Sequence, residues 1–225
     1  MTRWKAFGLH LALSLTIISG IALAALATWY PHGLWRISGL DRLLLIMLVI
    51  DVTAGPLLTL VIYRPGKRGL AFDLKVIALV QAAFLGYGLH TLWQARPVFL
   101  VGTDVRFTLI SASDIDPADL AKASRPEWRR LPWTGPYLVG VLPPADRAAR
   151  SALLDTFIRT GRDQEQLPAQ YLPYEDVAAT VLAKARANAA QEGRGQPALP
   201  IYSRDDEGWM LVDPQTGWPD RVRPR

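Results

Sequence analysis

Asp51 lies in the middle of a long apolar stretch, and its carboxyl group is the first candidate for chemistry in this sequence. Asp51, Gly55 and Thr59 follow one another at four-residue spacing, which places all three on one face of a helix. A carboxylate at the centre of a bilayer costs roughly 2.5–3.5 kcal/mol on insertion scales, so such a residue is usually kept for a partner or a role. We therefore expect Asp51 to be part of the functional site.

Two polar residues of the next apolar stretch could hydrogen-bond Asp51 from a neighbouring helix. Gln81 and Tyr87 lie on either side of the midpoint of that stretch. Pro56 should kink the helix that carries Asp51, because proline lacks a backbone donor and clashes with the preceding turn. The candidate partner-binding residues are therefore Asp51, Gly55, Pro56, Thr59, Gln81 and Tyr87.

Three interpretations of these polar residues remain open. They could only hold the helices together, with Asp51 protonated and bonded internally. They could instead line a groove that accepts the membrane helix of another protein, or form a proton or ion relay. Gly20 with Ala24, and Ala82 with Gly86, have the spacing that allows helices to approach closely. A transporter is disfavoured, since three spans with one acid and no repeat lack its usual features.

The elements that position these residues are three apolar stretches of about residues 7–27, 43–62 and 74–93. Each is close to the ~20 residues that cross a bilayer as a helix. The third could begin at Leu70 if Lys75 extends to the headgroups. A cleavable signal peptide is the alternative for the first stretch, but its apolar run exceeds the roughly 7–15 residues of a signal peptide. Residues 1–94 are expected to form a transmembrane domain.

The basic residues predict the orientation of these spans. Six of them precede the first span or lie between the second and third, whereas only Arg36 and Arg42 lie between the first and second. Because basic loops remain in the cytoplasm, the N-terminus is expected there and the tail on the other side. The aromatic residues near the predicted interfaces are Trp4, Trp29, Tyr30, Trp35, Tyr63 and Trp93.

The charge distribution argues against a nucleic-acid partner. The net charge is +5, but residues 95–225 hold 17 basic and 17 acidic residues, so the whole excess lies beside the spans. The chain has no cysteine, and its three histidines, His10, His32 and His90, all precede the tail. The absence of cysteine excludes a cysteine nucleophile, and the absence of histidine from the tail excludes a serine–histidine–aspartate site there. We expect no catalytic residues, no metal and no cofactor.

Residues 95–225 are expected to form an α+β domain. The runs Val98–Ile110, Tyr137–Val141, Pro200–Tyr202 and Gly208–Val212 predict strands. The helices are predicted after Asp116 as N-cap, from Asp146 to Arg159, and from Tyr174 to Gln191 with a stop at Gly193 and Gly195. The segment Asp213–Gly217 predicts a hairpin turn.

Candidate chemistry in the tail is weak. Asp114 and Asp116 could bind a metal, although a helix N-terminus explains them better, and the acidic run 205–207 has the composition of a solvated loop or a calcium site. Trp128, among charged residues, is either a contact residue or part of the core.

The stretch from Asp51 to Val101 carries a family resemblance, through Asp51, Gly55–Thr59, Pro65–Lys67, Phe72–Leu74, Gln81, Tyr87–Gly88 and Arg96–Pro97. A later match is the segment Val212–Gly217. With these residues the chain resembles the TfpX/TfpZ family of type IV pilin accessory proteins. Residues 112–196 match no motif of the family.

The resemblance implies an inner-membrane protein without catalysis that promotes the stability or assembly of a type IV pilin. Its expected partners are the major pilin, membrane lipid and other inner-membrane proteins of pilus assembly. The expected fold is three transmembrane α-helices followed by a small periplasmic α+β domain. The alternative is a membrane-anchored sensor or enzyme that acts through the periplasmic domain.

Overall fold

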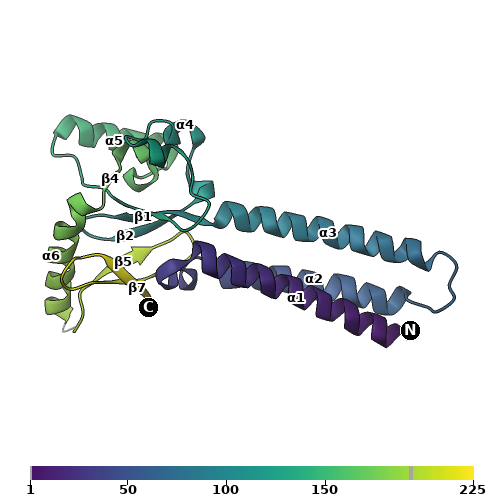
Figure 1. Cartoon of the computed structure of the whole chain (residues 1–225). Helices are drawn as coiled ribbons and strands as arrows, with labels where there is room; N and C mark the ends of the chain where they lie inside the picture. Colours follow the sequence, from purple (N-terminus) through teal and green to yellow (C-terminus); the bar gives the residue numbers. More distant parts are fainter. Residues whose placement is uncertain (1, 193–194) are drawn as a thin grey trace. The chain divides into compact units, whose positions relative to one another are not determined.

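The computed structural model describes residues 2–192 and 195–225 (Figure 1). The chain divides into two compact units, and each is built from two separate segments. The first unit, here called the three-helix unit, comprises Met1–Ala27 and Leu40–Gln94. The second, the α+β unit, comprises Thr28–Gly39 and Ala95–Arg225.

Three helices are long and apolar enough to cross a membrane: α1 (Arg3–Trp29), α2 (Leu40–Ile62) and α3 (Leu70–Ala95). Each contains one of the three predicted stretches and extends it by a few residues, which confirms the expected helices. Helix α3 begins at Leu70, and Lys67 in the preceding turn forms an ion pair of 2.6 Å with Asp73 in its first turn. An acidic residue in this position also interacts favourably with the helix dipole.

The α+β unit contains one mixed sheet with the strand order β4-β3-β1-β2-β5-β6-β7. Strand β1 runs parallel to β3 and antiparallel to β2, and β2, the central strand, runs parallel to β5. The remaining pairs, β3–β4, β5–β6 and β6–β7, are antiparallel. The strands are β1 (Pro97–Gly102), β2 (Phe107–Ser111), β3 (Tyr137–Gly140), β4 (Leu172–Pro173), β5 (Ala198–Tyr202), β6 (Glu207–Val212) and β7 (Pro219–Pro224).

Three α-helices and several single turns surround this sheet. Asp116 is the N-cap of α4, as predicted, and Asp146 is the N-cap of α5, because each carboxylate accepts a hydrogen bond from a backbone N–H of its helix. The predicted stop at Gly193 lies outside the described residues. The helices are α4 (Pro117–Leu120), α5 (Arg147–Thr160) and α6 (Glu175–Glu192), with 3-10 turns η1 (Pro31–Arg36), η2 (Ala112–Asp114), η3 (Pro126–Arg129), η4 (Gln164–Gln166) and η5 (Pro168–Gln170).

The hairpin turn at Asp213 joins β6 to β7, a strand that the sequence did not predict. The Asp213 carboxylate accepts hydrogen bonds from the backbone N–H groups of Gln215 and Thr216, at 2.8 and 2.7 Å. These bonds lower the pKa of Asp213. Gly217 closes the turn with a φ of 76°, a left-handed conformation that favours glycine.

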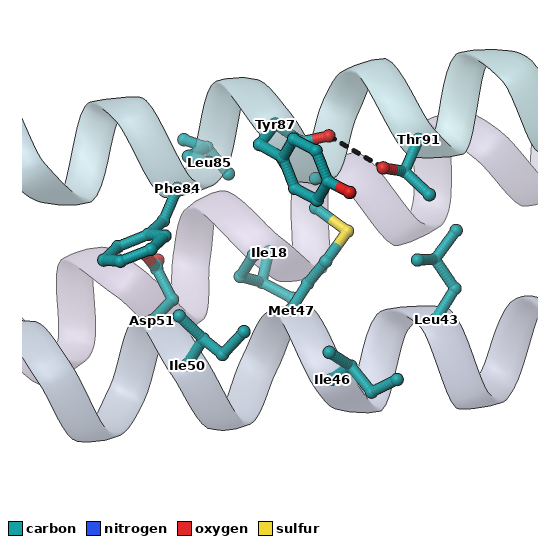
Figure 2. Close-up of a pocket in the computed structure, with 11 residues that line it drawn as sticks. Ile18, Leu43, Ile46, Met47, Ile50, Asp51, Phe84, Leu85, Tyr87 and Thr91 are labelled. Carbon is teal, nitrogen blue, oxygen red and sulfur yellow. Dashed lines mark hydrogen bonds between the residues drawn. The ribbon is translucent and has the colours of Figure 1, made fainter.

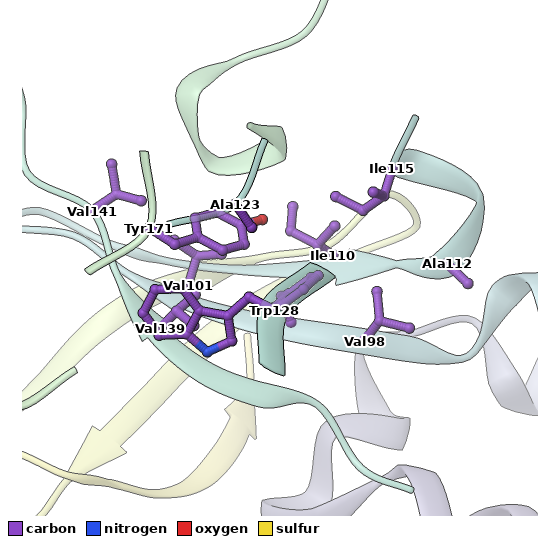
Figure 3. Close-up of a cluster of buried hydrophobic side chains, with 11 residues drawn as sticks. Val98, Val101, Ile110, Ala112, Ile115, Ala123, Trp128, Val139, Val141 and Tyr171 are labelled. Carbon is purple, nitrogen blue, oxygen red and sulfur yellow. The ribbon is translucent and has the colours of Figure 1, made fainter. Parts of the chain in front are cut away.

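One face of the sheet is covered by aromatic side chains (Figure 3). Trp128 and Tyr171 pack over Val139 and Phe99, and the ring centroids of Phe99 and Tyr171 lie 4.9 Å apart. The Tyr171 hydroxyl donates to the Glu165 carbonyl at 2.7 Å, so its one polar atom is satisfied. Trp128 is therefore a core residue, which decides between its two sequence interpretations.

Helix α6 covers the other face of the same strands. An added Cβ at Gly140 of β3 would overlap Val177 of α6, and one at Gly102 of β1 would lie 2.7 Å from the Tyr174 ring. Both glycines therefore allow α6 and its first turn to approach the sheet closely. Buried on both faces, β1 reads as a continuous apolar run.

The segment between α1 and α2 belongs to the α+β unit. Its η1 turn packs on β7, and His32 Nδ1 donates to the Asp220 carbonyl at 2.8 Å. The Ser203 hydroxyl donates to the Ile37 carbonyl. Tyr30, one of the aromatic residues near a predicted interface, is buried in this unit, and burial raises its pKa to about 12. The α1–α2 connection and the tail therefore lie on one side of any membrane that the helices cross.

Candidate functional site

Asp51 lies on the face of α2 that is turned toward the other two helices. Met47, Asp51, Gly55 and Thr59 are all buried, whereas residues on the outer face of α2 are exposed. Asp51 itself is only 7% exposed. The face predicted from the four-residue spacing is therefore the inner face of the helix.

Gln81 of α3 reaches across to α2. Its side-chain amide donates to the backbone carbonyl of Asp51 at 3.1 Å and also contacts the Asp51 carboxyl group. Gly55, one turn further along α2, makes room for this contact, because an added Cβ would overlap the Gln81 side chain. Asp51, Gly55 and Gln81 are thus brought together as one polar contact between two helices.

Helix α1 completes the polar cluster with His10 and Ser14, two residues that are not among the predicted partner-binding residues. His10 Nδ1 lies 2.7 Å from the Thr59 hydroxyl. Ser14, one turn away from His10, is buried and interacts with the Asp51 carboxyl group. The four-residue spacing of His10 and Ser14, continued by buried Ile18, is the signal that could have identified this face.

Pro56 lies inside α2 and is buried, and the helix continues without interruption to Ile62. Proline has no backbone N–H, so the carbonyl four residues earlier, at Val52, loses its usual helical donor. Pro56 is adjacent to Gly55 but contributes no side-chain donor or acceptor to the cluster.

A groove of about 250 Å³ lies between α2 and α3 at the Asp51 position (Figure 2). Its wall is almost entirely apolar, with Asp51 at one end. Tyr87 lines it and is 73% exposed; it hydrogen-bonds within α3, through its carbonyl, to Thr91. The lining residues are Ile18, Leu43, Ile46, Met47, Ile50, Asp51, Phe84, Leu85, Tyr87, Gly88 and Thr91.

The glycines that bring helices together are not the predicted pairs. Gly20 and Gly86 are exposed, and an added Cβ at either would meet no atom within 4 Å. The expectation that they mediate close approach within this chain is therefore wrong. Gly88 does so instead, because an added Cβ there would lie 2.8 Å from the end of Met47. Four-residue spacing identifies a helix face but not the neighbour of that face.

The acidic residues of the α+β unit stabilise local structure. Asp114 accepts a hydrogen bond from the Ser111 backbone N–H at 2.9 Å, and Asp116 accepts one from that of Ala118 at 2.8 Å. Asp206 accepts one from the Glu207 backbone N–H, in the loop between β5 and β6. These contacts agree with the helix-capping and loop interpretations of these carboxylates.

The fold and the groove together define a membrane-anchored protein in which a buried polar cluster borders an apolar groove between helices. The chain is similar to three proteins of Dichelobacter nodosus. "Fimbrial assembly protein, serogroup I" is 29% identical over 92% of this chain and 89% of the relative. "Fimbrial assembly protein, serogroups C1 and C2" is 34% identical over 49% of this chain and 86% of the relative.

The third relative, "Fimbrial assembly protein, serogroup E1", is 32% identical over 61% of this chain and 54% of its own length. The chain belongs to this family of fimbrial assembly proteins. No family model matches the chain, and no solved structure is similar to it.

Proposed function

We propose that this chain is a non-enzymatic accessory protein of type IV pilus assembly, of the TfpX/TfpZ kind, which binds a pilin before its incorporation into the pilus. The observation that carries the proposal is the groove beside Asp51, in a chain whose relatives are named fimbrial assembly proteins. Binding rather than catalysis is favoured because the chain has no cysteine and its histidines all lie in the first 94 residues.

The shape and chemistry of the groove suit a helix of another protein. Phe84 and Ile46 expose apolar surface at its mouth, and Asp51 at its end offers a carboxyl group in apolar surroundings. In lipid, helices associate through close packing and interhelical hydrogen bonds, because burial of apolar surface provides no driving force for their association there. A pilin membrane helix that inserts a side chain into the groove would use both types of contact.

We further propose that the protein lies in the bacterial inner membrane with its N-terminus in the cytoplasm and the α+β unit in the periplasm. The basic residues support this orientation, because six lie on the N-terminal side, whereas only Arg36 in the α1–α2 connection and Arg42 in the first turn of α2 lie on the other side. Packing of that connection with the tail supports a common side for both. An outer unit of this kind could contact the pilin head while the helices contact its membrane segment.

The experiment compares two acid substitutions in the same helix. Asp51→Ala should lower surface piliation and pilin abundance while the protein itself remains at normal levels. Asp41→Ala, at the exposed start of α2, is the matched control and should have no effect. Normal piliation with Asp51→Ala at undiminished protein levels would remove Asp51 from the mechanism.

A site-specific photocrosslinker tests directly whether the major pilin binds in the groove. At Ile46, which lines the groove, it should capture the epitope-tagged major pilin of the same bacterium, whereas at exposed Val61 on α2 it should not. Equal capture from both positions, or capture from neither, would contradict binding in the groove.

A further inference from the structure

The loop of residues 131–136, here called the Trp133 loop, exposes a large aromatic side chain of the α+β unit. Trp133 is 77% exposed, more than any other large hydrophobic side chain of the described residues. Its neighbour Thr134 is exposed as well, whereas Pro132 is buried. An indole combines an apolar ring with one hydrogen-bond donor, which is the chemistry of side chains at a membrane–water interface. Exposure alone does not identify what the ring contacts, so the position of the loop decides.

Two hydrogen bonds hold the Trp133 loop against the last turn of α1. Trp29 Nε1 donates to the Trp133 carbonyl at 2.8 Å, and the Gly135 backbone N–H donates to the Thr28 carbonyl at 2.7 Å. Thr28 and Trp29 belong to the α+β unit, and they are also the final residues of a helix that is long and apolar enough to cross a membrane. The loop is therefore fixed, within one unit, to the end of a membrane-crossing helix.

The length of α1 places its last turn at the membrane surface. Its 27 residues extend over ~40 Å at ~1.5 Å per residue, whereas the hydrocarbon of a bilayer is ~30 Å thick. Trp4 and Trp29 lie near its opposite ends, and tryptophan is enriched at both membrane–water interfaces. Because the Trp133 loop is bonded to Thr28 and Trp29, it lies at the depth of the lipid headgroups.

The topology of the sheet gives the same position independently. Strand β1 follows α3, the third membrane-crossing helix, with only Arg96 between them. Strand β3 runs parallel to β1 with Tyr137 opposite Phe99, and the Trp133 loop directly precedes β3. The loop therefore lies at the end of the sheet that the chain enters from α3. The opposite end, at Gly102, is roughly 17 Å further along β1 at ~3.3 Å per residue.

We infer that the Trp133 loop binds the lipid surface, with the Trp133 indole in the headgroup region of the leaflet in which α1 ends. A bilayer is the occupant because the loop is hydrogen-bonded to a helix end that lies at that depth. The ring packs against the upper part of the acyl chains, and its N–H donates to lipid oxygens or water. The inference requires only that the helices cross a membrane, and it does not depend on the pilus assignment. It adds a non-covalent contact that restricts the tilt of the α+β unit on the membrane.

A nitroxide label measures the depth of the loop in the full chain, which has no natural cysteine that would take the label elsewhere. In phospholipid vesicles, a label on Thr134→Cys should collide more often with oxygen, which concentrates in lipid, than with a water-soluble nickel chelate. A label on Val105→Cys should show the reverse, because Val105 is 48% exposed at the opposite end of the sheet. Addition of Trp133→Ala should shift the Thr134 label toward the accessibility of the Val105 label. Equal accessibility of the two labels with Trp133 in place would overturn the inference.

Brominated lipid tests the indole itself, because bromine quenches tryptophan fluorescence at short range. In vesicles of phosphatidylcholine brominated near the carbonyl end of its acyl chains, Trp133→Phe should lower the quenched fraction of the emission, since it removes a quenched fluorophore. Trp218→Phe is the matched control and should raise that fraction. Trp218 contacts Tyr174, whose ring packs over Gly102 at the far end of the sheet, so the control removes an unquenched fluorophore. An unchanged or raised fraction with Trp133→Phe would place the indole in water and overturn the inference.

Discussion

The two units of the molecule differ in the share of polar and small residues that they bury. In the α+β unit the fully buried side chains are mostly large and apolar, such as Phe99, Phe107 and Leu199. On α2 the buried positions include an acid, a glycine, a proline and a threonine, while many leucines and valines of the helix are exposed. Leucine and valine therefore lie mainly inside the α+β unit, whereas many of those on α2 lie on its outer face.

This difference follows from the solvent of each unit. Water drives apolar side chains into the interior at roughly 25 cal/mol per Å² of buried surface. Lipid chains are as apolar as leucine, so helices in a membrane are joined by close packing and hydrogen bonds instead. The contacts at Gln81 and Gly55 are close packing and hydrogen bonding between helices. The contacts around Phe99 instead bury apolar surface away from water. Three substitutions test this distinction.

The largest effect is expected in the apolar core. Phe99→Ala should lower the free energy of unfolding of the α+β unit by about 3–5 kcal/mol, because it removes buried surface and leaves a cavity beside Tyr171. Denaturant unfolding in detergent, followed by tryptophan fluorescence, measures this. Phe72→Ala, at a position 70% exposed on α3, is the control. Equal losses from both variants would contradict the contrast between the units.

A smaller effect, seen only at alkaline pH, is expected from Tyr30. Burial raises its pKa from 10.0 to about 12, so the protonated phenol stabilises the folded state. That stabilisation is complete below pH 10 and is lost as the pH rises through 12, by about 2–3 kcal/mol. Denaturant unfolding across this pH range should show a steeper decline for the natural chain than for Tyr30→Phe. Identical pH profiles would place Tyr30 in contact with water.

The smallest effect is expected from a glycine in the three-helix unit. Gly55→Val should separate α2 from α3 by overlap with Gln81 and cost about 1–3 kcal/mol. Gly20→Val changes helix propensity in the same way but meets no atom within 4 Å, so it is the matched control. Thermal denaturation in detergent should distinguish the two. A Gly20→Val variant as unstable as Gly55→Val would show that helix propensity, and not packing against Gln81, causes the loss of stability.

Much of the fold could be predicted because its signals are local. Apolar stretches of membrane-crossing length identify α1, α2 and α3 without reference to any partner. The cap at Asp116 acts on the residues that follow it directly, and the apolar spacing of residues 146–159 is also local, so α4 and α5 were predicted as well. Asp51, Gly55 and Thr59 share a face by helix geometry alone.

The features that were not predicted depend on distant neighbours. Strand β7 contains two prolines and three charged residues, a composition that predicts no strand, and it forms because it pairs with β6 at an edge of the sheet. His10 contacts Thr59, 49 residues away, across a helix pair whose rotation the sequence does not specify. The exposure of Leu154 and Ile158 on α5 was not predicted for the same reason, since helical periodicity predicts an apolar face but not what covers it.

The contact between η1 and β7 has a consequence for biosynthesis. His32 and Asp220 are separated by 188 residues, so the α1–α2 connection emerges long before the strand on which it packs. At roughly 5–20 residues per second, the ribosome needs about 10–40 s to synthesise the intervening chain. During that interval β7, on which the connection packs, has not yet been synthesised. The α+β unit can therefore cover η1 only after β7 has been synthesised, and a copy cut short before residue 219 would leave η1 uncovered.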